Sequence, residues 1–249
     1  QKMPNDKELR LVLAAQLADV GQADQGIADA KALLKGTPDD RVVYLALGQI
    51  YSRLRRWSDA EASLDQAEKL SDSPDEKREI LFLRASYFER QKKYDAAEDL
   101  FKRLLAADPG NPTVLNYLGY MLADRGVRLE EALGYVKKAV EVDPHNGAFL
   151  DSLGWAYFKL GNYELAEENL RKAADKSRDD ATILEHLGDL YQKTGRLKLA
   201  AAQWERALDS LNKTIAVEVE PADLARVQKK LESAKVRLAQ QQPSPRKPQ

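Results

Sequence analysis

The chain has 249 residues, with 39 basic and 40 acidic side chains, a formal net charge of -1 and no cysteine. This balance gives no indication of a polyanionic partner, and the lack of cysteine excludes disulfides, zinc–cysteine sites and thiol nucleophiles. No run of eighteen apolar residues predicts a membrane span. Because the first residue is not Met, we expect the chain to be a segment of a longer protein.

Similar units follow one another from residue 7 to residue 214 at spacings of 34, 37, 34, 35 and 34 residues. They begin at Lys7, Arg41, Arg78, Pro112, Gly147 and Ala181. The eighth position of a unit is always Gly or Ala, and the eleventh is always Leu, Tyr or Phe. Small residues facing large ones at a fixed period are typical of stacked helices in a repeat protein, whereas a catalytic site needs its polar groups only once.

Each unit is predicted to contain two helices. Its apolar residues have helical spacing in both halves, and glycine often stands between the halves at the fifteenth position, as in Gly161 and Gly195. The 37-residue spacing has its own explanation in the segment SDSPDE. There Ser73, Pro74 and Glu76 predict a capping box with proline in the first helical turn.

A further helix is predicted over residues 220–240, starting near Pro221. Its apolar stripe consists of Leu224, Val227, Leu231, Ala234 and Leu238. We interpret it as a capping helix on the last unit, and a coiled-coil seam between two chains is the alternative. The capping interpretation favours a monomer. Residues 241–249 are polar and proline-rich and are predicted to be disordered.

These units resemble the tetratricopeptide repeat over residues 7–214. The resemblance implies an all-α fold, a right-handed superhelical solenoid of about six helix pairs plus the C-terminal capping helix. It also implies a role in binding a protein or peptide partner in a groove lined by the first helices. The middle units, from NYLGYML to ENLRKA, look like bacterial repeat proteins that include envelope-associated and lipoprotein adaptors, which favours a periplasmic or envelope location over a cytoplasmic one.

The family geometry places certain positions of each first helix in the partner groove. The candidate groove residues are Leu45, Gln49, Phe82, Ser86, Asn116, Tyr120, Asp151, Trp155, Phe158, Glu185 and Asp189. We expect Trp155 to be an exposed anchor for a partner and the last unit to be acidic; the alternative is that the aromatic residues are ordinary core. Lys and Asn never pair at the fifth and ninth positions, so recognition of a chaperone tail is not indicated.

Catalytic, metal and nucleic-acid functions find little support in the sequence. His145 and His186 have no second histidine at helical spacing and are expected to be solvated, so no metal or cofactor is predicted. No glycine-rich phosphate loop occurs, and the acidic last unit argues against RNA. We therefore predict a non-enzymatic interaction scaffold. The alternative is an accessory region of a larger enzyme or of a secretion or assembly machine.

Overall fold

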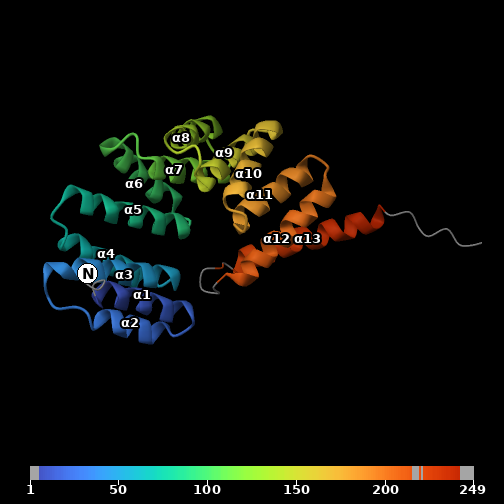
Figure 1. Ribbon diagram of the computed structural model, residues 1–249. Helices are drawn as coiled ribbons and strands as arrows, with labels where there is room; N and C mark the ends of the chain where they lie inside the picture. Colours follow the sequence, from blue (N-terminus) through green and yellow to red (C-terminus); the bar gives the residue numbers. More distant parts are fainter. Residues whose placement is uncertain (1–5, 215–218, 220, 242–249) are drawn as a thin grey trace, which may run out of the picture. The chain divides into compact units, whose positions relative to one another are not determined.

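The computed structural model describes residues 6–214, 219 and 221–241, which contain thirteen α-helices and no β-strand (Figure 1). The predicted all-α fold class is confirmed. Apart from Gln241, the tail predicted to be disordered lies outside the described residues. None of the helices in the described part of the chain is long and apolar enough to cross a membrane.

The helices divide between two compact units, unit 1 within residues 6–109 and unit 2 within residues 110–214 and 219–241. Unit 1 holds three helix pairs, α1 (Asp6–Asp19) with α2 (Ala23–Lys31), α3 (Arg41–Arg53) with α4 (Trp57–Lys69), and α5 (Pro74–Arg90) with α6 (Tyr94–Ala107). Unit 2 holds α7 (Pro112–Asp124) with α8 (Leu129–Val142), α9 (Gly147–Lys159) with α10 (Tyr163–Lys176), α11 (Ala181–Lys193) with α12 (Leu197–Lys213), and α13 (Pro221–Gln240). A 3₁₀ helix, Pro38–Asp40, precedes α3.

The chain turns between the two helices of every pair at a residue with a left-handed backbone. In four pairs this residue is the glycine at the fifteenth position, for example Gly161 with φ of 81° and Gly195 with φ of 79°. Arg55 and Lys92 occupy the same position in the other two pairs, with φ of 57° and 61°. Glycine adopts this conformation without the steric penalty of a Cβ atom, which explains its recurrence there.

The predicted capping box at the start of α5 is confirmed. The Ser73 hydroxyl accepts a hydrogen bond from the Glu76 backbone N–H at 3.2 Å, and the Glu76 carboxylate accepts one from the Ser73 N–H at 3.0 Å. Pro74 lies in the first turn, where its missing N–H has no intrahelical partner to lose. In unit 2 the side chains of Asn111, Asn146 and Asp180 cap the first helices α7, α9 and α11 in a related way.

The first and second helices of a pair pack closely at the small residue of the eighth position, as two glycines of unit 2 show. An ideal Cβ atom on Gly154 of α9 would lie 2.7 Å from Cγ of Leu170 on α10 and 3.0 Å from the Leu170 backbone nitrogen. On Gly188 of α11 it would lie 2.3 Å from Nε1 of Trp204 on α12. Leu170 and Trp204 are fully buried. Glycine is therefore required at these positions by the packing of the two helices.

Replacement of Gly154 by leucine is expected to destabilise unit 2 by about 1–3 kcal/mol or more, because the new side chain meets a buried neighbour and its backbone. In a repeat array coupling runs mainly between neighbours, so hydrogen exchange should quicken most in α9, α10 and the adjoining pairs. Gly134→Ala is the matched control, since a Cβ there meets nothing within 4 Å in α8 and alanine favours the helix. An equal loss of protection in α3 and α4 would contradict coupling that runs mainly between neighbouring pairs.

Candidate functional site

Unit 1 contains four of the predicted groove residues, of which three are buried or half-buried and one is exposed. Leu45 of α3 is buried, and Gln49 of the same helix is exposed. Phe82 and Ser86 of α5 are half-buried. The ring of Phe82 lies edge-on to Phe101 at 6.1 Å, and the Ser86 hydroxyl donates to a carbonyl of its own helix. These side chains are engaged mainly within the unit.

Unit 2 contains the other seven predicted groove residues, all on the first helices α7, α9 and α11. We call this set the first-helix surface of unit 2: Asn116, Tyr120, Asp151, Trp155, Phe158, Glu185 and Asp189. Asn116, Tyr120, Phe158 and Asp189 are half-buried. Asp151, Trp155 and Glu185 are buried. The predicted positions thus form a partly exposed layer over a buried polar and aromatic layer.

An aromatic cluster joins the three first helices. The Trp155 indole stacks on the His186 ring, with centroids 3.9 Å apart and planes at 13°, and on Phe158 at 4.8 Å and 10°. Tyr120 of α7 approaches His186 at 6.1 Å. Ring contacts of this kind add to the free energy gained from burial alone. The cluster therefore holds the exposed edges of Tyr120 and Phe158 in defined positions.

His186 is buried, so the expectation that both histidines are solvated is wrong for this one, although His145 is exposed. Its Nδ1 lies 2.9 Å and 3.1 Å from the two carboxylate oxygens of Asp151, which is also buried. Burial by itself lowers the pKa of His186, but the charge and hydrogen bond of Asp151 outweigh it, and the pKa is raised. Asp189 and Glu185 act in the same direction.

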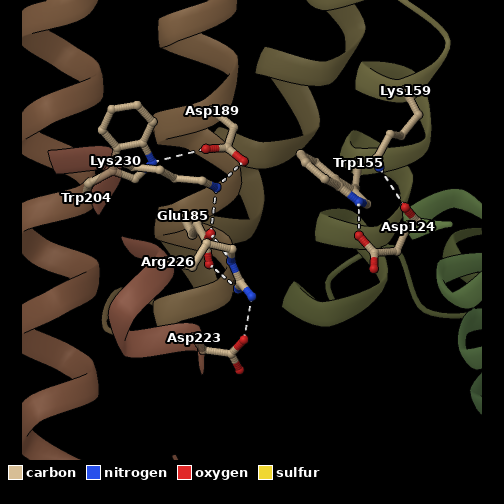
Figure 2. A network of polar contacts seen from close by, with 9 residues as sticks. All are labelled: Asp124, Trp155, Lys159, Glu185, Asp189, Trp204, Asp223, Arg226 and Lys230. Atoms are coloured by element: carbon tan, nitrogen blue, oxygen red, sulfur yellow. Dashed lines mark hydrogen bonds and ion pairs between the residues drawn. The ribbon is translucent and has the colours of Figure 1, made fainter. Parts of the chain in front are cut away.

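Trp155 is 6% exposed, so the expectation that it is an exposed anchor is wrong, and the alternative of core packing holds for it. Its indole N–H donates to Asp124 Oδ1 at 3.2 Å, as Figure 2 shows. Lys159 donates to the Asp124 backbone carbonyl at 2.7 Å and places its ammonium over the indole ring. The neighbouring first helices enclose this side chain. Its burial therefore cannot be predicted from the sequence of α9 alone.

The acidic residues of α11 are paired with basic residues of α13, as Figure 2 shows. Arg226 donates to both oxygens of Glu185, at 2.7 Å and 2.8 Å. Lys230 donates to Glu185 at 2.6 Å and to Asp189 at 2.7 Å. Trp204 also donates its indole N–H to Asp189, at 3.2 Å. The expected acidic end of the groove is therefore largely neutralised within the chain.

The geometry explains why Glu185 is charged although it is only 6% exposed. Burial by itself raises the pKa of Glu185, but the hydrogen bonds from Arg226 and Lys230 lower it below its ordinary value. The stabilisation from this pairing is complete above the unfolded-state pKa and is lost as the pH falls through the lowered folded-state pKa. This network serves stability between α11 and α13.

Asn116 is the member of the surface with an unused polar atom. Its Oδ1 is buried and, within the described part of the chain, has no hydrogen-bond partner. Tyr120 stands one helical turn further along α7. A buried carbonyl oxygen without a donor is uncommon, because it loses its hydration without replacement. Because this oxygen is buried, it is not accessible to a partner on the exposed surface.

Helix pairs that recur at a nearly constant period, with a small residue where the two helices pack together, define a helical-repeat protein. A sequence model described as Tetratricopeptide repeat matches residues 11–74, 45–112, 82–147 and 152–213. The chain belongs to the tetratricopeptide repeat family. Proteins of this family act as scaffolds that bind other proteins.

Individual relatives agree with the family. A TPR repeat-containing protein of Pseudomonas aeruginosa is 35% identical over 97 residues, which cover 39% of this chain and 16% of that protein. The crystal structure of a thermophilic TPR protein of Thermus thermophilus has a TM-score of 0.63 and 25% identity, covering 79% of this chain and 99% of that one. Yeast Tom70 shares the fold with a TM-score of 0.67 and 19% identity, covering 94% and 47%.

The type IV pilus biogenesis factor PilW also shares the fold, with a TM-score of 0.60 and 20% identity, covering 83% of this chain and 95% of that one. At this level of identity the likeness concerns the fold alone. The matched segment spans only about a sixth of the length of the Pseudomonas relative.

Several residues of the site were not among the sequence candidates, and three of them form its buried ion pairs. His186 stands one residue after Glu185 and was interpreted as a surface residue. Arg226 and Lys230 lie on α13, outside the repeat pattern. Their spacing of four residues places both side chains on one face of a helix. The spacing does not indicate which helix that face packs against, so the sequence alone could not predict their acidic partners.

Proposed function

We propose that this protein is an interaction scaffold without chemistry of its own, which holds a segment of a partner protein on the first-helix surface of unit 2. The observation that carries the proposal is the pair of half-buried aromatic side chains, Tyr120 and Phe158, backed by the buried rings of Trp155 and His186. A rigid aromatic surface loses little entropy when a partner binds.

The chemistry of this surface favours an apolar partner segment over a strongly basic one. Glu185 and Asp189 already bind Arg226 and Lys230, so they offer little uncompensated charge to a ligand.

The His186–Asp151 pair has the composition of a general base and its orienting carboxylate, but its position favours a structural role. His186 is 5% exposed, and its ring stacks against Trp155. A general base must reach the proton that it abstracts, directly or through one water molecule. We therefore assign this pair to the support of the surface.

The proposal predicts that Tyr120→Ser and Phe158→Ser each weaken partner binding about tenfold or more, the scale of an interface hot spot. Affinity capture with the unaltered chain, followed by mass spectrometry, identifies the partner, and titration calorimetry then measures each variant. Leu199→Ser is the control, because this residue of the second helix α12 is 47% exposed and lies off the first-helix surface. Equal binding by all three variants, with unchanged circular dichroism, would refute the site.

A second proposal is that the chain is the interaction module of a larger protein or assembly. The matches to the Pseudomonas protein and to Tom70 cover only 16% and 47% of those chains, which supports a module within a longer polypeptide. An envelope location stays a prediction. The full-length coding sequence would separate this proposal from a free-standing adaptor.

A further inference from the structure

His186 is a buried titratable group held at the centre of the first-helix surface of unit 2. Its ring stacks on Trp155 of α9 at 3.9 Å and approaches Tyr120 of α7 at 6.1 Å. Its Nδ1 contacts both oxygens of Asp151. One ring thus joins the first helices of three successive pairs, and any change in its charge acts on all of them.

The charged groups around this ring come from several elements. On α9, Asp151 contacts the ring directly, while on α11 itself Glu185 and Asp189 are close enough to influence it. Both of these residues are neutralised by Arg226 and Lys230 of α13. On the far side of Trp155, the indole N–H contacts Asp124 and the ammonium of Lys159 lies over the ring. Among the described residues, α10 and α12 place no titratable group in hydrogen-bond or ion-pair contact with His186.

Asp151 therefore depends on His186 for its compensating charge. It is 5% exposed, and within the described part of the chain its side chain makes polar contacts with the imidazole ring. When the imidazole is protonated, the two groups form a buried ion pair. When it is neutral, the N–H can still donate a hydrogen bond, but the carboxylate is left as a buried charge without a counterion, which is strongly unfavourable.

We propose that His186 and Asp151 form a protonation switch beneath the first-helix surface of unit 2, which keeps Trp155 and Phe158 stacked when the imidazole is charged and loosens them when it is neutral. The consequence for partner binding rests on the proposed function. The switch itself is a property of the free protein. It can therefore be refuted without refuting the proposed partner binding, and the reverse is also true.

The direction of the pH dependence follows from the raised pKa of His186. The stabilisation from the charged pair is complete below the unfolded-state value of about 6.5 and is lost as the pH rises through the folded-state pKa. The first-helix surface should accordingly be tightest at mildly acidic pH and looser at alkaline pH. This is the reverse of the pH dependence of the Glu185 network.

Proton NMR of the free chain between pH 5 and pH 9 tests the switch directly, because only two histidines are present. His145→Gln assigns the two imidazole signals and Trp155→Phe assigns the indole N–H of Trp155. We expect His186 to titrate above the ordinary histidine value of about 6.5, and the Trp155 indole signal to shift with the same midpoint. The indole signal of Trp57, in unit 1, should not follow that midpoint.

Matched variants separate a switch from a merely structural contact. His186→Gln keeps a hydrogen-bond donor but cannot be protonated, so it should abolish the pH-dependent shift of the Trp155 indole signal. His186→Gln combined with Asp151→Asn removes both charges and should recover amide protection in α9 and α11 about tenfold over His186→Gln alone. The proposal is overturned if His186 does not titrate above the ordinary histidine value of about 6.5, if the Trp155 indole signal does not respond, or if the double variant recovers no protection.

Discussion

Removal of residues 221–249 is expected to destabilise unit 2 by roughly 5 kcal/mol or more. Val227, Leu231 and Ala234 of α13 are buried within the unit, and burying one large aliphatic side chain contributes about 1.5–3 kcal/mol. The truncation also leaves Glu185 buried without its two cations, and breaking a buried ion pair adds several kcal/mol. Hydrogen exchange should show the largest loss of protection in α11 and α12, which adjoin the deleted helix.

A shorter truncation that removes only residues 242–249 is the control and should leave the exchange pattern unchanged. Sedimentation of both truncated chains tests the alternative interpretation of the stripe as a seam between two chains. In that case the longer truncation would convert a dimer into a monomer while α11 and α12 kept their protection. That outcome would contradict the capping role that we propose for α13.

Trp155→Ala is expected to cost about 3–5 kcal/mol of stability, the range for a large aromatic residue removed from a core. The substitution removes the ring on which both His186 and Phe158 stack, and it leaves Asp124 without its indole donor. Urea unfolding followed by circular dichroism measures the change. Because a repeat array need not unfold in two states, exchange protection in α9 provides the local measure.

Trp155→Phe is the matched variant, since it keeps an aromatic ring and loses mainly the hydrogen bond to Asp124, which contributes about 1 kcal/mol. An exposed anchor would behave differently. If Trp155→Ala lowered stability by less than about 1 kcal/mol, the buried position of the indole would be refuted and a direct contact with a partner would regain support.

The helix pairs could be predicted from the sequence because their determinants are local or periodic. Gly161 and Gly195 indicated turns from their own conformational freedom, and Ser73 with Glu76 indicated a helix start through contacts three residues apart. Gly154 and Gly188 recur in the same register as their partners Leu170 and Trp204, so one unit predicts the packing of the next.

The candidate surface was predictable only in part. The first-helix positions around Tyr120 and Phe158 followed from the resemblance to the repeat family, and the structure places these side chains half-buried together with His186 and Trp155. Exposure could not be predicted in the same way. It depends on the side chains of the neighbouring helices, and Trp155 is enclosed by residues that lie 31 positions before it and 31 after it in the chain.

By itself the sequence determined the all-α class, the repeat and the turns, since these depend on residues close together or at a fixed period. Only the tertiary structure decided which polar groups of the surface are available. Glu185 meets Arg226 from 41 residues away, and His186 meets Asp151 from 35 residues away. Such pairs form between single residues and do not recur from unit to unit, so periodicity carries no information about them, and their charges become compensated only when the helices are packed.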